Sequence, residues 1–253
     1  MHDLGQIARL DRGFFGFIHL VRRAFLIRSV GLLAVAWCTV ALNAPALGAV
    51  SSRTGKNIND AGRPVILVVG DSLSAEYGLQ RGQGWVQLLA NRLQQSGSNY
   101  TVANASISGD TTSGGRTRLP ALLKQHRPSI VIIELGGNDG LRGLPVARMQ
   151  DNLAAMVRAS QATGARVIVA GIRMPANYGR EYTERFYAAF ADVAKQYNTA
   201  LVPFLLDGFS DSADFFQADR IHPSAQAQAR ILQTVWPVLE PMILAKASVK
   251  ARS

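Results

Sequence analysis

The sequence contains little cysteine and few acidic residues. The first shortage excludes some kinds of site, and the second gives the chain a positive charge. Its single cysteine, Cys38, excludes an intramolecular disulfide and a zinc site built from several thiolates. Lysine and arginine outnumber aspartate and glutamate by 27 to 17, giving a net charge of +10. After the first fifty residues, however, the basic side chains are scattered singly, without interleaved aromatic residues. This pattern argues against nucleic-acid binding and leaves a bias toward anionic surfaces.

The first fifty residues differ in kind from the rest. Three arginines precede an uncharged apolar run, Ser29–Leu42, and the small residues of NAPALGAV follow it. A basic stretch, a short apolar run and a small-residue exit predict a secretory signal peptide over residues 1–49, with cleavage near residues 46–49. A retained membrane anchor is the alternative, because uncharged residues continue beyond the run. Asn43 and Pro45 in that continuation favour the signal peptide.

Cleavage there would send the mature chain to the periplasm or outside the cell. It would also remove Cys38, which excludes disulfides, thiolate metal sites and a cysteine nucleophile together. Residues 50–63 are polar and predict a flexible lead-in, residues 64–245 a single domain, and residues 246–253 a short tail. The mature chain would keep a positive charge and have the length of one globular domain with a sizeable core.

Apolar segments of strand length recur from residue 64 onward. They are the runs PVILVV, YTVANA, IVIIEL, RVIVAG and ALVPF, which begin at residues 64, 100, 130, 166 and 200. Their Val, Ile and Leu content predicts strands buried on both faces, as in a parallel sheet. Amphipathic stripes separate them over residues 85–93, 146–157, 186–197 and 231–239, and a shorter helix is expected to start near Pro120. This alternation predicts one three-layer α/β/α domain with a five-stranded, mostly parallel sheet.

Polar segments rich in glycine follow the first three predicted strands. They read GDSLS from Gly70, SISGDTTSGG from Ser106 and GGNDG from Gly136. Because sites in parallel sheets form at the carboxyl ends of the strands, these three loops are expected to share one edge. Taken alone, each predicts only a turn, since Gly, Asp, Asn and Ser all favour turns for local reasons.

A serine nucleophile at Ser72 would need a base to take its proton, usually a histidine held by a carboxylate. Of the four histidines, two lie in the predicted signal peptide, and His126 is expected to cap a helix end. His222 in the segment ADRIHPSAQ is then the remaining candidate, with Asp219 three residues before it. Pro223 is expected to open the last helix.

Acyl transfer also needs hydrogen-bond donors aimed at the oxyanion that develops in the transition state. The backbone N–H of Gly109 is unobstructed by a side chain, and Asn138 carries an amide donor. Three aspartates at the same strand ends offer the alternative of a magnesium site. Each has a local use in its turn, so we expect neither a metal nor a cofactor; they are Asp71, Asp110 and Asp139.

The ordered blocks GDSLS, SGD, GGND and DRIH resemble the SGNH (GDSL) hydrolases, and the resemblance runs from about Pro64 to Pro237. The segments NASISGDTTSGG, RLPALLKQHRP, ELGGNDGLRG and MPANYG are similar to the bacterial periplasmic thioesterases, lysophospholipases and arylesterases of that family. The resemblance implies a flavodoxin-like fold. It also implies a site composed of the nucleophile Ser72, the base His222, the orienting carboxylate Asp219, and an oxyanion hole from the Ser72 and Gly109 amides and the Asn138 side chain.

The resemblance further implies a serine esterase that hydrolyses acyl thioesters and carboxylic esters through an acyl-enzyme, with lysophospholipids among its substrates. We expect a monomer that makes transient contact with anionic membrane surfaces and binds no nucleic acid. Two alternatives stay open: a carbohydrate O-acetyl esterase on the same fold, and a non-catalytic module whose loops hold a ligand without turning it over. The apolar residues expected to line the acyl pocket are Leu144, Met174, Phe215 and Phe216.

Two charged residues flank the predicted site. Glu76 follows the nucleophile block, and Arg220 lies inside the Asp-x-x-His segment. Glu76 is expected either to be solvated or to disfavour anionic head groups, and Arg220 is expected to attract acidic substrates.

Overall fold

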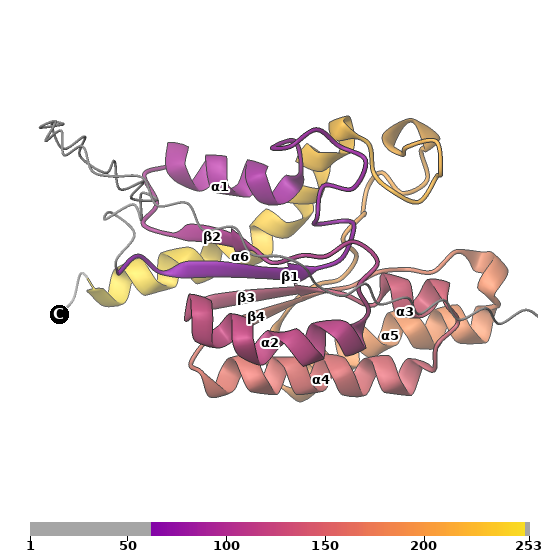
Figure 1. Cartoon of the computed structure of the whole chain (residues 1–253), viewed down its shortest axis with the longest axis horizontal. Helices are drawn as coiled ribbons and strands as arrows, with labels where there is room; N and C mark the ends of the chain where they lie inside the picture. The colour runs from indigo at the N-terminus through magenta and orange to yellow at the C-terminus, as the bar shows by residue number, and fades with distance from the viewer. Residues whose placement is uncertain (1–61, 251–253) are drawn as a thin grey trace, which may run out of the picture. The chain divides into compact units, whose positions relative to one another are not determined.

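The computed structural model describes residues 62–250, with side chains as far as residue 245. The predicted signal peptide, its cleavage site and most of the lead-in lie outside the described residues. The core is a five-stranded, wholly parallel sheet with strand order β2-β1-β3-β4-β5 (Figure 1). The strands are β1 (Val65–Gly70), β2 (Thr101–Asn104), β3 (Ile130–Glu134), β4 (Arg166–Ala170) and β5 (Ala200–Val202).

The two central strands explain why this sheet forms. Every residue of β3 is buried, and so is β1 from Ile66 onward, because their runs of β-branched and leucine side chains are covered on both faces. In the register of this pair Gly70 lies beside Glu134, so the two strands end together. All five strands coincide with the apolar runs, and the prediction of a parallel sheet is confirmed.

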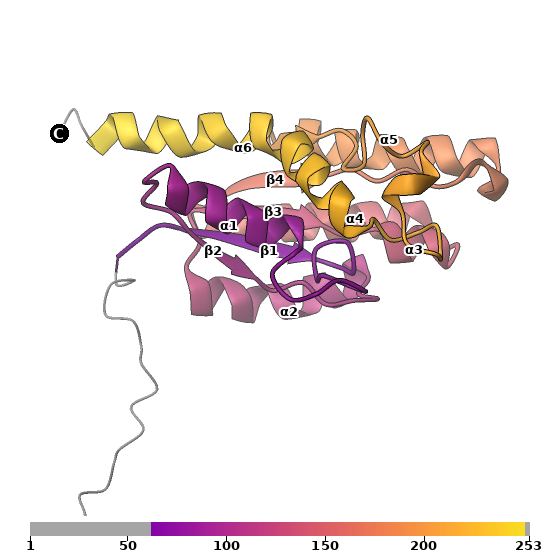
Figure 2. The same ribbon diagram turned by 90° about the horizontal axis from the view of Figure 1, so that it is seen from above.

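Helices cover both faces of the sheet. On one face α1 (Trp85–Gln95) packs against α6 (Gln228–Lys250), and on the other α4 (Val146–Ala162) lies between α2 (Thr112–His126) and α5 (Arg180–Gln196) (Figures 1 and 2). Short elements complete the chain: α3 (Gly137–Leu141) and the 3-10 turns Ala176–Tyr178, Ala213–Phe215 and Ala225–Ala227. This is the three-layer α/β/α architecture expected from the sequence. Within residues 62–250, no helix has the length and hydropathy needed to cross a membrane.

Two prolines do not act as predicted. Pro120 lies inside α2, which begins at Thr112 after the Thr111 side chain accepts a hydrogen bond from the Gly114 N–H. The buried face of that helix holds it together, and the proline removes one backbone hydrogen bond rather than marking the start. Pro223 does not open the last helix either, because it pairs in an isolated β-bridge with Phe216, and α6 begins only at Gln228.

Candidate active site

Ser72 lies on a tight turn directly after β1. The Asp71 carbonyl accepts hydrogen bonds from the N–H groups of Ser74, at 3.2 Å, and Ala75, at 2.9 Å. The Asp71 carboxylate accepts a further one from the Leu73 N–H at 3.1 Å. The backbone therefore bends sharply around Ser72, and its half-buried side chain reaches the lining of a cavity at the carboxyl edge of the sheet.

The predicted base and its carboxylate meet the serine from the other end of the chain. His222 Nε2 lies 2.9 Å from Ser72 Oγ, and His222 Nδ1 lies 2.6 Å from Asp219 Oδ2. The other oxygen of Asp219 accepts the N–H groups of Ile221 and His222, at 2.9 and 3.0 Å. The Gln217 N–H donates to the His222 carbonyl at 2.7 Å and closes the segment into a loop. A single short loop thus delivers both side chains, as the Asp-x-x-His spacing predicts.

The charge of Asp219 sets the orientation of the imidazole. Burial raises its pKa, but hydrogen bonds from the His222 N–H, the His222 ring and the Ile221 N–H outweigh burial and lower the pKa to about 2. The ionised carboxylate therefore accepts the Nδ1 proton, and the Nε2 lone pair faces the Ser72 hydroxyl. The Tyr77 ring lies 4.3 Å from the His222 ring and covers one of its sides.

Gly109 lies on a loop that runs beside the nucleophile turn. The Ile107 N–H donates to the Gly70 carbonyl at 3.0 Å, which extends the pairing of the chain past the end of β2. Gly109 itself has φ +79°, a backbone conformation that favours glycine. Its carbonyl accepts a hydrogen bond from the Arg142 guanidinium at 3.0 Å, and this bond helps to fix the orientation of the peptide group that follows Gly109.

Asn138, in the first turn of α3, completes the predicted set of oxyanion donors. Its amide donates to the Asp71 carboxylate at 3.1 Å, which fixes the amide plane and leaves its second N–H unused by that bond. The backbone N–H groups of Ser72 and Gly109 donate to no other residue of the described chain. The structure therefore brings the predicted donors to the edge that carries Ser72, the candidate nucleophile.

A buried group that the sequence analysis missed lies beneath the turn. Glu134, the last residue of β3, is fully buried and accepts hydrogen bonds from Ser74 Oγ at 2.6 Å and the Asp71 N–H at 3.3 Å. Burial and the neighbouring Asp71 carboxylate raise the pKa of Glu134 well above its ordinary value. Burial likewise raises the pKa of Asp71 to about 6. The available signal was a single acidic residue at the end of an otherwise apolar strand.

A cavity of about 480 Å³ opens over Ser72 and His222. Met174 and Phe216 line it, as predicted for the acyl pocket. Other apolar residues of its wall, which the sequence analysis did not single out, are Leu73, Leu141, Ile172, Phe204, Leu206 and Ile221. An apolar hollow beside a nucleophile suits the hydrocarbon part of an acyl substrate.

The other two residues predicted for the acyl pocket lie elsewhere. Leu144 lines a separate hollow beside α2 and α4. Phe215 belongs to a 3-10 turn, and its ring packs 5.8 Å from the ring of Phe209 and beneath the Arg230 guanidinium, at 4.3 Å. Consecutive residues point in different directions there, so Phe216 faces the cavity and Phe215 does not.

Of the two charged residues predicted to flank the site, only Arg220 lines the cavity over Ser72. The Glu76 carboxylate accepts the N–H groups of Gly82, at 3.1 Å, and Gly84, at 2.8 Å. It closes its own loop and does not line the cavity, so its predicted effect on anionic head groups is not supported. Arg220 is exposed and lines the cavity, in a left-handed backbone conformation at φ +57°.

The three strand-end aspartates each have their own partners. Asp71 binds Asn138, Asp110 pairs with Arg118 at 2.7 Å, and Asp139 accepts from the Thr112 hydroxyl at 2.6 Å. No group of three metal-ligating side chains gathers among residues 62–250. The alternative of a magnesium site therefore has no support in the described geometry.

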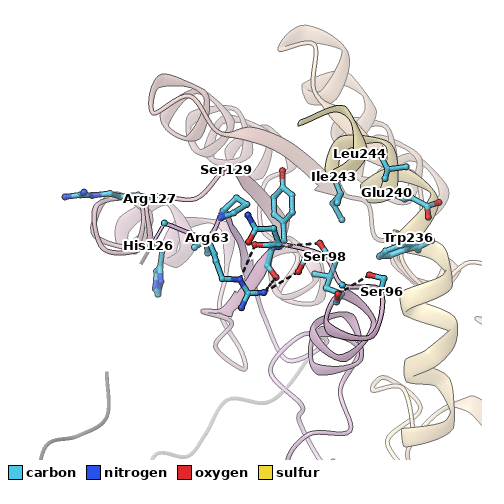
Figure 3. Close-up of a pocket in the computed structure, with 17 residues that line it drawn as sticks. Arg63, Ser96, Ser98, His126, Arg127, Ser129, Trp236, Glu240, Ile243 and Leu244 are labelled. Carbon is cyan, nitrogen blue, oxygen red and sulfur yellow. Dashed lines mark hydrogen bonds between the residues drawn. The ribbon is translucent and has the colours of Figure 1, made fainter. Parts of the chain in front are cut away.

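A larger cavity, of about 870 Å³, lies at the opposite edge of the sheet. It is lined by residues at the amino ends of the strands, such as Val65 and Ser129, and by the end of α6 around Trp236 and Leu244 (Figure 3). None of the residues predicted for catalysis lines it. Size therefore does not identify the site here, because the smaller cavity is the one lined by Ser72 and His222.

Comparisons with known proteins agree with this geometry. The model of the GDSL-like Lipase/Acylhydrolase family matches residues 68–230. Esterase TesA from Pseudomonas aeruginosa is 52% identical over 183 residues, which cover 72% of this chain and 91% of that protein. Thioesterase 1/protease 1/lysophospholipase L1 from Escherichia coli strain K12 is 41% identical over 183 residues, covering 72% of this chain and 86% of that one.

The fold agrees as well as the sequence. A crystal structure of TesA superposes with a TM-score of 0.69 at 54% identity, and the match covers 70% of this chain and 98% of that one. The family model spans the nucleophile turn, both loops with oxyanion donors and the Asp219–His222 loop. On these grounds the chain belongs to the GDSL-like lipase/acylhydrolase family of ester-hydrolysing enzymes, the SGNH hydrolases.

Proposed function

We propose that this chain is a serine esterase of broad acyl specificity in which Ser72 is the nucleophile, His222 the base and Asp219 the carboxylate that orients it. One observation carries the proposal: hydrogen-bond distances of 2.9 and 2.6 Å join Ser72, His222 and Asp219 at the wall of an apolar cavity. A nucleophile, a base and an orienting group in that order constitute the arrangement that activates a serine hydroxyl.

The reaction proceeds in two halves. Ser72 Oγ attacks the carbonyl carbon of the ester or thioester while its proton passes to His222 Nε2. The N–H groups of Ser72 and Gly109 and the Asn138 amide receive the negative charge of the tetrahedral oxygen. The carbon–oxygen or carbon–sulfur bond then breaks, and His222 returns the proton to the leaving group. Water, deprotonated by the same imidazole, attacks the carbonyl carbon of the acyl-enzyme. The bond from that carbon to Ser72 Oγ breaks, His222 returns the proton to Ser72 Oγ, and the carboxylic acid is released.

Two features support thioesters and lysophospholipids as substrates. The relatives named above are an esterase and a protein whose name combines thioesterase and lysophospholipase activity. The apolar wall around Met174 and Phe216 suits an acyl chain, while Arg173 and Arg220 line the same cavity. Guanidinium groups there fit the phosphates that coenzyme A thioesters and lysophospholipids share.

We also propose that the chain is exported, loses residues 1–49 and acts as a monomer in the periplasm or outside the cell. The basic stretch, apolar run and small-residue exit support export. The excess of basic residues supports transient contact with anionic membrane surfaces. Mass spectrometry of the protein recovered from the periplasm and the medium would give its N-terminus, and an N-terminus at Met1 would contradict this proposal.

Hydrolysis of p-nitrophenyl esters from acetyl to palmitoyl tests the catalytic proposal. Ser72→Ala should abolish turnover, whereas Ser113→Ala, which changes an exposed serine on α2, should match the unmodified enzyme. Turnover restricted to the acetyl ester would favour the carbohydrate O-acetyl esterase. No turnover of any ester by the folded protein would favour the binding module.

A further inference from the structure

A carboxyl group with no role in the proposed reaction lies directly beneath the nucleophile. Glu134 ends β3 beside Gly70, the residue that ends β1. A Cβ at position 70 would lie 2.6 Å from Glu134 Oε2 and 2.8 Å from Ser74 Oγ, which is closer than such atoms can approach. The glycine of the GDSLS block therefore leaves the space that the Glu134 carboxyl and the Ser74 hydroxyl occupy.

One oxygen of this carboxyl holds the chain on both sides of Ser72. Glu134 Oε2 accepts from the Asp71 N–H, one residue before the nucleophile, and from Ser74 Oγ, two residues after it. Trp85 Nε1 donates to Ser74 Oγ at 3.2 Å, so the Ser74 hydroxyl proton is directed at Glu134. The direction of the Ser72 hydroxyl, and of its backbone N–H, thus depends on this anchor.

The surroundings of Glu134 favour an uncharged acid. The carboxyl is fully buried, and its bonded partners in the described chain are a hydroxyl and a peptide N–H, with no cation among them. The charge that acts on Glu134 is that of the Asp71 carboxylate, whose hydrogen bonds from Leu73 and Asn138 stabilise a negative charge. Two adjacent buried anions repel each other, so the charge belongs on Asp71.

Other charged groups around the turn act on Asp71 or on the backbone. Arg118 pairs with Asp110 and also reaches the Gly70 carbonyl, at 3.3 Å. His222 attracts the Asp71 carboxylate and Asp110 repels it. Both effects are on the charge of Asp71. The raised pKa of Glu134 agrees with a negative charge on Asp71 and a proton on Glu134.

We propose that Glu134 is a positioning residue that anchors the nucleophile turn as a neutral carboxylic acid, and so keeps a second negative charge away from the oxyanion hole. This inference rests on the proposed function of Ser72. Ionisation of Glu134, as the pH rises through its raised pKa, places an uncompensated charge beneath the developing oxyanion and slows acylation.

The experiment compares Glu134→Leu and Glu134→Gln in the purified enzyme, with kcat and KM measured on p-nitrophenyl butyrate across pH. Leucine removes the acceptor, and kcat should fall about 100-fold while KM changes little, because a small misplacement of the nucleophile costs about that much. Glutamine keeps a neutral oxygen acceptor and should restore kcat to within about fivefold. In the unmodified enzyme kcat should fall as the pH rises through the raised pKa of Glu134, and this fall should be absent in Glu134→Gln.

Three outcomes would overturn the inference: full activity in Glu134→Leu, a Glu134→Gln variant as inactive as Glu134→Leu, or the same dependence of kcat on pH in Glu134→Gln and in the unmodified enzyme. If Glu134→Leu fails to fold, Ser74→Ala removes the same anchor from the other side and should lower kcat about tenfold with KM retained; unchanged kcat there would also overturn it. Unmodified enzyme without turnover dependent on Ser72 would instead overturn the proposed function, so the two failures are distinct.

Discussion

Two segments together form the proposed site and are held in place by different means. They are the nucleophile turn, residues 71–75, and the base loop, residues 217–222. The turn at Ser72 is fixed from below by buried side chains that belong to other elements, among them Glu134 and Trp85. The loop that carries His222 is fixed by its own backbone and by the carboxylate of Asp219, three residues away. The position of the nucleophile therefore depends on the packing of the sheet, whereas the position of the base depends on a local loop near the surface.

Because of this difference, substitutions in the two segments should affect activity and the free energy of unfolding differently. Changes in the base loop should lower activity and leave the free energy of unfolding nearly unchanged, because few buried contacts are lost. Changes beneath the nucleophile turn should alter both, since a buried polar network contributes to folding as well as to orientation. The following substitutions test that contrast.

The largest effect is expected from Asp219→Asn in the base loop. The asparagine oxygen can still accept the N–H groups of Ile221 and His222, so the loop should keep its shape. Its amide can donate to His222 Nδ1 and so favour the wrong tautomer, and kcat should fall about 10⁴-fold. Asp192→Asn, an exposed carboxylate on α5, is the matched control. A kcat within tenfold of the unmodified enzyme would contradict the role of Asp219.

A smaller loss is expected from Asn138→Ala. The alanine removes one oxyanion donor and frees the Asp71 carboxylate from its hydrogen bond, so kcat should fall about 10²- to 10³-fold. KM for the same p-nitrophenyl ester should change far less, because the donor acts on charge that develops in the transition state. A rise in KM with kcat unchanged would instead indicate that Asn138 binds the ground state.

Beneath the turn, Glu134→Gln should change how stability depends on pH. The folded-state pKa of Glu134 is raised, so above its ordinary value of 4.5 the unfolded chain loses this proton while the folded chain keeps it. The stability from Glu134 is fully present below that pH and is lost as the pH rises through the folded pKa. Glutamine cannot ionise, so the stability of the variant relative to the unmodified enzyme should rise from about pH 4.5 upward. Urea unfolding across pH measures the difference, and a flat difference would contradict it.

The parts of the structure that the sequence predicted are those with local signals. The five strands follow from continuous apolar runs, and Asp219 meets His222 because they are only three positions apart in one loop. Glu134 was missed because its contact depends on the register that sets β3 beside β1, which no short segment reveals. Phe215 was misassigned for a related reason, since neighbouring aromatic residues differ only in the direction that a turn gives them.

The smallest effect on activity is expected from the Gln217 side chain, which connects the base loop to the segment that follows the nucleophile turn. The Gln217 amide donates to the Tyr77 carbonyl at 2.8 Å and the Pro223 carbonyl at 3.2 Å, and so links the base loop to the residue whose ring covers His222. Gln217→Ala removes both bonds, and kcat/KM should fall about three- to tenfold while the free energy of unfolding changes little, because the bond to Tyr77 is exposed.

Gln217→Glu sharpens this last test, because it keeps the size of the side chain and loses the donor. It should lower kcat/KM as much as Gln217→Ala does if the hydrogen bonds, rather than packing, hold the loop. Gln161→Ala is the matched control, since that amide donates to the Tyr197 carbonyl at 2.9 Å far from the site. Equal losses of activity in the two alanine variants would mean that the base loop needs no tether and is positioned by its own backbone alone.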